Sequence, residues 1–173
     1  EVTVTIEESY SEPESVTLVV NPADKFQAVA EAELPLVVLD KAIVLNQLFK
    51  LEENATIRDK VTVTVTNASG TTTSYTYMPG TTWAEGELNF TQAGEVIVSI
   101  QETYSTAETV TLEVKNKFSA KTNVTAEVDK AVKLSELFDS VEGAQIGDIT
   151  VTATNAKYNE AGAAWGDKTV TFL

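Results

Sequence analysis

Two stretches of the chain are nearly identical. Residues 1–10 read EVTVTIEESY, and residues 95–104 read EVIVSIQETY. The correspondence continues through the matching tryptophans Trp83 and Trp165 to Phe90 and Phe172, and the spacing between partners falls from 94 residues at the start to 82 there. Connecting loops tolerate such shortening and strands do not. The chain is therefore predicted to contain one fold twice, with shorter connections in the second copy.

The duplication can be divided into domains in two ways. One division takes residues 1–94 and 95–173 as two complete domains. The other takes residues 1–20 as a closing hairpin, 21–115 as a complete domain, and 116–173 as a domain that lacks its last hairpin. Periodicity leaves both divisions open, because a repeat has no intrinsic start.

Apolar and polar residues alternate along most of the chain, and Thr is the commonest polar member of the pattern. A period of two is typical of antiparallel strands with one buried and one solvated face. The apolar positions predict six half-buried strands: Val2, Val4 and Ile6; Val16, Leu18 and Val20; Val61, Val63 and Val65; Val96, Val98 and Ile100; Val110, Leu112 and Val114; Ile149, Val151 and Ala153.

One segment of each copy departs from this period. In KLSELFDSV, residues 133–141, the apolar residues recur at intervals of three and four, which is typical of a helix. A short helical turn that caps one end of a sandwich is therefore expected in both copies. The residues concerned are Leu134, Leu137, Phe138 and Val141 in the second copy, and Leu45, Leu48 and Phe49 in the first.

Short strands without alternating helices predict an all-β sandwich, present twice. The stretch LNFTQAGEVIVSIQETYSTAETVTLEV, Leu88 to Val114, resembles the closing strands of bacterial immunoglobulin-like repeats from large cell-surface proteins. This resemblance implies two tandem Ig-like antiparallel β-sandwiches. It also implies that EVTVTI and SVTLVV in residues 1–20 are the last two strands of a domain.

Composition excludes several classes of function. The chain has 26 acidic and 12 basic residues, a net charge of −14, so its surface repels nucleic acid and anionic membranes. It has no run of 18 apolar residues, and we expect no direct membrane insertion. It also has no cysteine, so core packing alone must stabilise a protein that we expect to be extracellular or at the cell surface.

The chain lacks the residues on which most catalysis depends. Without His or Cys, the Ser-His and Cys-His arrangements and the usual zinc sites cannot form. The neighbouring acids Glu7-Glu8 and Glu52-Glu53 would point to opposite faces of a strand and cannot flank a substrate. We therefore predict no enzymatic activity and no cofactor. Calcium is the one metal such an acidic chain suits, but its aspartates are scattered and form no calcium loop: Asp40, Asp129, Asp139 and Asp148.

Aromatic residues suggest a second kind of site. Trp83 and Trp165 occupy matching positions, which favours a packing role over a ligand-stacking role. Tyr75 and Tyr77 have no counterparts in the second copy and are the better candidates for a ligand contact peculiar to the first. Four asparagines lie in glycosylation sequons, although chance matches are expected in a Thr-rich chain: Asn54, Asn67, Asn89 and Asn123.

These features predict a non-catalytic structural region of a surface protein, such as a stalk, an adhesin shaft or a surface-layer or fibre element. Its partners would be neighbouring repeats or copies of itself, with cell-surface glycans or proteins as further candidates. One alternative is a filament subunit that donates its N-terminal hairpin head to tail, and another is a carbohydrate-binding module. The hairpin would act through Val2, Val4, Ile6, Val16, Leu18 and Val20.

Overall fold

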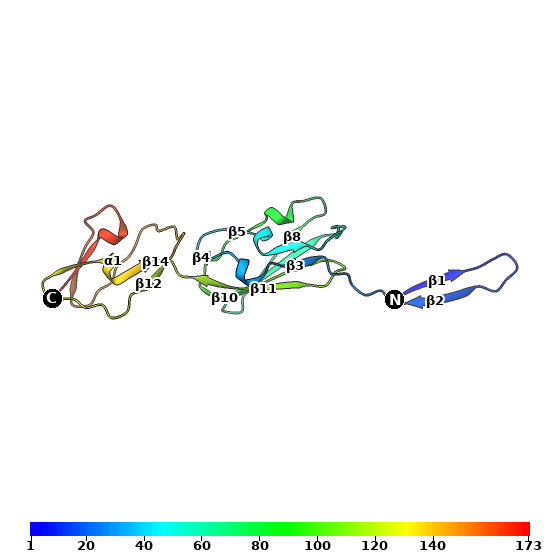
Figure 1. The fold of residues 1–173 in the computed structure, drawn as a ribbon, viewed down its shortest axis with the longest axis horizontal. Coiled ribbons are helices and arrows are strands. Elements are labelled where there is room, and N and C mark those ends of the chain that lie inside the picture. The colour runs from blue at the N-terminus through cyan, green and yellow to red at the C-terminus, as the bar shows by residue number, and fades with distance from the viewer.

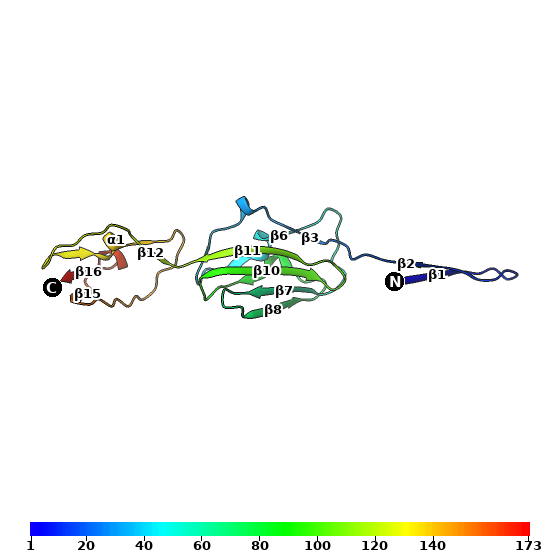
Figure 2. The same ribbon diagram turned by 90° about the horizontal axis from the view of Figure 1, so that it is seen from below.

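The computed structural model describes residues 1–173, and nearly all of its regular structure is β. Three bodies follow one another along a line: an N-terminal hairpin, a larger central unit and a smaller C-terminal unit (Figure 1). A view turned by 90° shows the same linear arrangement (Figure 2). The prediction of a β-rich chain is confirmed. No helix has the length and apolar character needed to cross a membrane.

The hairpin consists of β1 (Val2–Ile6) and β2 (Glu14–Leu18), which pair in antiparallel fashion. It projects beyond the central unit, and all of its residues are exposed. The prediction of strands here is confirmed, but the prediction that one face is buried is wrong. Alternation specifies which side chains share a face, whereas burial requires a second layer, and no element lies against this hairpin.

The central unit, residues 21–115, is built on one five-stranded sheet. Strand β4 pairs in parallel with β11, and all the other pairs are antiparallel. The order across the sheet is β4 (Val37–Val38), β11 (Glu108–Lys115), β10 (Gly94–Glu102), β7 (Val61–Thr66) and β8 (Thr72–Tyr77).

A second layer covers one face of this sheet. It contains two short antiparallel pairs and three single turns of 3-10 helix. The pairs are β3 (Phe26–Ala28) with β6 (Phe49–Leu51) and β5 (Ile43–Val44) with β9 (Glu87–Leu88); the turns are η1 (Glu31–Glu33), η2 (Leu45–Gln47) and η3 (Trp83–Glu85).

The core of the central unit lies between these layers. The alternating apolar residues of β7, β10 and β11 point inward, and the intervening threonines and acids mostly face solvent. Phe26 and Trp83 meet edge to face with ring centroids 5.1 Å apart. The core also contains Leu45, Leu48, Phe49, Leu88 and Phe90.

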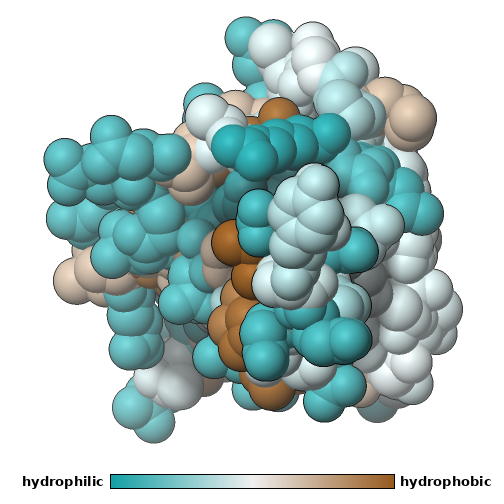
Figure 3. Space-filling view, turned by 90° about the vertical axis from the view of Figure 1, so that its right-hand side faces the viewer, coloured by the Kyte–Doolittle hydropathy of each residue, from teal (hydrophilic) through white to brown (hydrophobic).

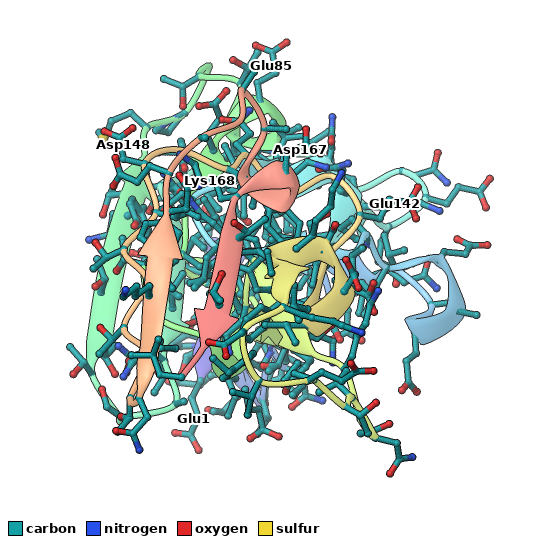
Figure 4. The ribbon with its side chains drawn as sticks, turned by 90° about the vertical axis from the view of Figure 1, so that its left-hand side faces the viewer. Glu1, Glu85, Glu142, Asp148, Asp167 and Lys168 are labelled. Atoms are coloured by element: carbon teal, nitrogen blue, oxygen red, sulfur yellow. The ribbon has the colours of Figure 1, made fainter.

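The C-terminal unit, residues 116–173, repeats the two strand pairs of the second layer of the central unit and adds strand β15 to one of them. Strands β15 and β16 lie side by side when this unit is viewed end on (Figure 4). Its elements are β12 (Phe118–Ala120) paired with β14 (Phe138–Ser140), a sheet of β13 (Ala131–Lys133), β16 (Thr169–Phe172) and β15 (Ala156–Asn159), helix α1 (Leu134–Leu137) and the turn η4 (Trp165–Asp167).

The two units share local backbone geometry as well as element order. The N–H of Asp40 donates to the carbonyl of Phe90 at 3.0 Å, and the N–H of Asp129 donates to that of Phe172 at 2.9 Å. Both aspartates adopt a left-handed conformation, with φ of 56° and 61°. Matching hydrogen bonds at matching residues indicate that the C-terminal unit is built on the same plan.

One strand predicted for the C-terminal unit is absent. Residues 149–153 correspond to β7, yet they form no strand. In the central unit β7 is held between β8 and β10, whereas no hairpin corresponding to β10 and β11 lies in the C-terminal unit. The prediction of a strand at Ile149, Val151 and Ala153 is therefore wrong for this structure, because a strand needs a neighbour for its backbone groups.

The helical turns are present and shorter than predicted. Helix α1 ends at Leu137, and Phe138 begins strand β14. In the first copy the turn is the 3-10 helix η2. The pairing of β14 with β12 takes over at Phe138, so the apolar spacing does not continue as a helix to Val141.

The first of the two domain divisions, with its boundary between residues 94 and 95, would cut through the five-stranded sheet of the central unit. Strands β10 and β11 pair with β7 and β4, which precede that boundary. In the second division, all five strands fall within residues 21–115.

Candidate assembly surfaces

The C-terminal unit has an apolar cavity of about 290 Å³. Phe118 and Trp165 meet there with ring centroids 4.8 Å apart, and Phe138 keeps 39% of its surface exposed. The apolar side chains of the lining are Phe118, Leu134, Phe138, Ile149, Val151 and Trp165.

Each of these six residues has a counterpart in the closed core of the central unit. Phe49, the counterpart of Phe138, is fully buried, and Trp83 repeats the contact of Trp165 with a phenylalanine. The six counterparts, in the same order, are Phe26, Leu45, Phe49, Val61, Val63 and Trp83. The same set of apolar side chains is therefore buried in the central unit and accessible in the C-terminal unit.

Strands β10 and β11 supply the inward side chains that face this core in the central unit. Six apolar residues on them are 5% exposed or less: Val96, Val98, Ile100, Val110, Leu112 and Val114. Their sequence counterparts on the hairpin are 46% to 74% exposed: Val2, Val4, Ile6, Val16, Leu18 and Val20.

The hairpin and the β10–β11 pair also have the same register. Val4 lies opposite Val16 in the hairpin, and Val98 lies opposite Val110 in the central unit. All five residue pairs of the hairpin correspond to pairs of β10 and β11 at the sequence offset of 94. Viewed from the hairpin end, the molecule has a narrow column of hydrophobic surface bordered by hydrophilic residues (Figure 3).

A buried ion pair anchors β10 at the end next to its turn. The Nζ of Lys25 lies 3.3 Å from Oε2 of Glu102, whose residue surface is only 3% exposed. The Oε1 of Glu102 accepts hydrogen bonds from the backbone N–H of Arg58 and, at 2.8 Å, from that of Asp59. Lys25 also donates to the carbonyl of Thr56 at 2.6 Å. We call Lys25, Glu102 and the two N–H donors the carboxylate clamp.

The clamp favours the ionised form of Glu102. Burial on its own would raise the pKa of this carboxyl group. The N–H groups of Arg58 and Asp59 and the Lys25 ammonium outweigh that effect, so the pKa of Glu102 lies below its ordinary value. Glu102 is therefore a charged, fully paired group in the interior of the central unit.

The clamp residues recur in the repeat but are not together in the second copy. Lys25 corresponds to Lys117, and Glu102 corresponds to Glu8 on the hairpin. Lys117 pairs instead with Asp40, at 2.8 Å, while Glu8 is exposed at the opposite end of the molecule. Sequence reasoning considered the neighbouring pair Glu7-Glu8 only as possible catalytic acids and missed the clamp. The one sequence signal that could have indicated it is the repetition of both the Lys and the Glu in the two copies.

The structure separates the four aromatic candidates. Trp83 is buried in the core, and Trp165 lines the cavity of the C-terminal unit. Tyr75 and Tyr77 lie on β8, are half-buried and pack against the core of the central unit. Burial and the neighbouring Tyr75 raise the pKa of Tyr77. These side chains are engaged in packing and do not form one exposed stacking surface.

The four sequon asparagines lie in different settings. Asn54, Asn89 and Asn123 are exposed, and Asn54 and Asn123 adopt left-handed backbone conformations. Asn67 is half-buried, and its Oδ1 accepts hydrogen bonds from the N–H groups of Ser69 and Thr71 in the turn between β7 and β8. The Asn67 side chain therefore builds a turn.

The acidic residues are dispersed. No group of three or more Asp or Glu side chains is arranged to hold a metal ion. Of the four aspartates considered for calcium, Asp40 pairs with Lys117 and Asp139 pairs with Lys121 at 3.2 Å. Asp148 and Glu142 lie on opposite sides of the C-terminal unit in the end-on view (Figure 4), and the exposed Asp129 occupies a tight turn.

Three comparisons, with models of protein families, with curated proteins and with solved structures, found no match. The functional argument therefore rests on the surfaces described above.

Proposed function

We propose that this chain is a non-catalytic structural repeat region of an extracellular surface protein, as part of a stalk, an adhesin shaft, or a surface-layer or fibre element. Its building blocks under this proposal are tandem immunoglobulin-like sandwiches, divided at residues 1–20, 21–115 and 116–173. Its partners are neighbouring repeats or further copies of the chain. The observation that carries the proposal is the very short joint between the two units.

Only Asn116 and Lys117 separate strand β11 of the central unit from strand β12 of the C-terminal unit. A connection of two residues cannot behave as a flexible coil, because a coil needs many residues to lose the direction of the chain. The last strand of one unit therefore leads almost directly into the first strand of the next. This continuity supports a strut in which the orientation of one unit constrains that of its neighbour.

Side chains from both units meet at the joint. The ion pair between Asp40 and Lys117 connects a loop of the central unit to the joint itself. Nearby, the side chain of Lys41 in the central unit lies against the backbone of Gly143 in the C-terminal unit. Its Nζ is only 2.5 Å from the position that a Cβ atom at residue 143 would occupy. These contacts support a limited range of bending.

The surface chemistry also suits a shaft. Outward positions on β11, such as Thr109, Thr111 and Glu113, are exposed and polar. With a net charge of −14, neighbouring shafts repel one another at low ionic strength. Polar, acidic sheet surfaces of this kind oppose lateral edge-to-edge association.

Residual dipolar couplings test the proposal directly. We expect backbone couplings from residues 26–114 and 118–172 to fit one shared alignment tensor. Separate tensors of clearly different magnitude would show that the units reorient independently, and the strut proposal would then be wrong.

The joint itself can be tested with a matched pair of variants. Asp40→Asn removes the charge that pairs with Lys117 and should increase the difference between the two alignment tensors. Asp129→Asn is the control, because Asp129 has the same left-handed backbone conformation and no part in the joint. Asn adopts this conformation readily, so neither change should disturb the turn.

A further inference from the structure

We propose that the hairpin of a second copy of this chain docks into the C-terminal unit and completes its sandwich. This goes beyond the strut proposal, because a strut needs no recognition between its ends. The docked hairpin would take the place that β10 and β11 occupy in the central unit. The central unit thus serves as an internal template for the interface.

The first argument is the match between the two surfaces. Six apolar residues line the cavity of the C-terminal unit, and their six counterparts are buried in the core to which β10 and β11 contribute in the central unit. The hairpin presents the counterparts of the residues that bury them, on one face and in the same register. A segment that reproduces both the pattern and the pairing of β10–β11 fits this cavity better than an arbitrary apolar strand.

The second argument is that residues 149–153 have no strand partner. In the central unit Val98 pairs with Val65, and Ile100 pairs with Val63. The repeat places Val4 of the incoming hairpin opposite Ala153, and Ile6 opposite Val151. Docking would therefore convert an irregular segment into a strand with a partner, as in other cases where an added strand completes a sheet.

The third argument is charge. Docking by this register brings Glu8 of the second copy to Lys117, as Glu102 lies beside Lys25. Residues 146–148 lie just before Ile149, in the same place in the repeat as Arg58 and Asp59 before Val61. Their backbone N–H groups would therefore face the Glu8 carboxylate after docking, as those of Arg58 and Asp59 face Glu102. The interface would thus acquire its own carboxylate clamp, which fixes the register as well as the apolar fit.

The placement of the two surfaces decides the form of the assembly. The hairpin and the C-terminal unit lie at opposite ends of the long axis (Figures 1 and 2). A contact between two different surfaces on identical molecules is heterologous, and it propagates unless the rotation between copies closes a ring. Copies of this chain would therefore join head to tail into filaments that continue the line of units within each molecule.

Two blocking variants of the full chain test this proposal. Val4→Glu places a charge where its counterpart Val98 is fully buried, and Val151→Glu does the same at the counterpart of Val63. We expect the unmodified chain to form filaments by light scattering and negative-stain microscopy, and each variant alone to remain monomeric. An equimolar mixture should give one discrete heterodimer, since one variant retains an intact hairpin and the other an intact cavity.

A matched control places the same charge on the opposite face of the hairpin. Thr3→Glu neighbours the blocked Val4 and should leave filament formation intact, because its counterpart Ile97 keeps 41% of its surface exposed in the central unit. A monomeric unmodified chain would overturn the proposal, as would filaments that persist in Val4→Glu, because another segment would then be the occupant. The heterodimer needs only the hairpin of Val151→Glu and the cavity of Val4→Glu, so its absence from a mixture in which the central unit of both variants unfolds as in the unmodified chain would also overturn the proposal.

A cross-link tests the register even if one blocking variant misfolds. The chain has no native cysteine, and Ser99 pairs with Thr64 on the outward face of the central sheet. The counterparts are Thr5 and Thr152, so oxidised Thr5→Cys/Thr152→Cys should give a ladder of covalent multimers on a non-reducing gel. Thr5→Cys/Thr150→Cys is out of register and should give at least several-fold less. Equal ladders, or none, would refute the docking geometry.

The clamp is tested within the heterodimer of the two blocking variants. Glu8→Gln in the hairpin donor should weaken its affinity at least about tenfold, the effect of losing a buried charge-assisted contact. Glu7→Gln removes the same charge one residue away and matches Gln101 of the central unit, so affinity should change less than about twofold. Equal effects would show that Glu8 does not reach Lys117. The alignment test of the strut is made on the monomeric Val4→Glu chain, in which Lys117 keeps its pair with Asp40, so the two proposals can fail separately.

Discussion

Replacing Glu102 in the central unit should cause one of the largest losses of stability available to a single substitution in this chain. Glu102→Ala leaves the Lys25 ammonium, whose side chain is 16% exposed, without its carboxylate. It also leaves the N–H groups of Arg58 and Asp59 without their acceptor. Breaking a buried pair costs about 3–5 kcal/mol, and a buried donor without an acceptor about 1–3 kcal/mol, less for these two N–H groups because they are only partly buried. Because these terms overlap, we expect a total of about 3–5 kcal/mol.

Smaller changes at the clamp should cost less, and the order of the losses is informative. Glu102→Gln retains an oxygen that can accept from the N–H groups, so we expect a loss of about 1.5–3 kcal/mol. Glu95→Ala is the control, because Glu95 is an exposed acid on the same strand and should change stability by no more than about 0.5 kcal/mol.

Urea unfolding followed by tryptophan fluorescence measures these losses. A Trp165→Phe background leaves Trp83 as the reporter of the central unit, since each unit has one tryptophan. A Glu102→Ala loss below about 1 kcal/mol, or one no larger than that of Glu95→Ala, would refute the view that the clamp is a buried, fully paired charge.

The pH dependence of the same measurement checks the sign. The pKa of Glu102 is lowered in the folded protein, so its stabilising effect is complete above the ordinary carboxyl pKa of about 4.3 and is lost as pH falls through the lower folded value. The stability advantage of the unmodified chain over Glu102→Gln should therefore be constant near neutrality and shrink in acid. A difference that grows in acid would contradict the lowered pKa.

Three further predictions concern other parts of the molecule. Asn67→Ala should cost about 1 kcal/mol by removing the acceptor that organises the β7–β8 turn, measured by urea unfolding. Tyr77→Phe should abolish the last phase of an alkaline absorbance titration, because burial, and to a smaller extent Tyr75, raise the pKa of Tyr77. Since the folded pKa is raised, Tyr77 stabilises the fold below about pH 10, and this stabilisation is lost as the pH rises further. Leu45→Ala should cost about 2–5 kcal/mol in a closed core, whereas its counterpart Leu134→Ala should cost less beside an open cavity, as judged from the two tryptophan transitions.

Much of the fold could be predicted from the duplication and from alternation. The repeated Leu45 and Leu134 segments both form a short turn, and Phe26 with Trp83 is matched by Phe118 with Trp165 as an edge-to-face pair. These features depend on contacts between residues of the same layer, and both copies contain that layer. A repeat of the residues therefore gives a repeat of the structure.

The misses share one physical cause. Val4 and Val98 sit in nearly identical sequences, yet one is half exposed and the other fully buried. Val63 lies in a strand and Val151 does not. Local sequence specifies the face and the extension of a strand, but burial and pairing depend on which other segment is present. The carboxylate clamp was missed for a related reason, because its three segments are far apart in the chain and only the fold brings them together.

The clamp also determines how the central unit would respond to tension along the shaft. A pull from the N-terminal side enters at Lys25, whose backbone leads into β3 and whose ammonium is paired with Glu102 on β10, and a pull from the other side leaves through Lys115 at the end of β11. Glu102 and Lys115 lie at opposite ends of the paired strands. The two strands are thus drawn past each other, and the hydrogen bonds between them share the load and resist as a group. Under force, the lifetime of the unit would then be set by the slow rate of shearing this pair, not by its equilibrium stability.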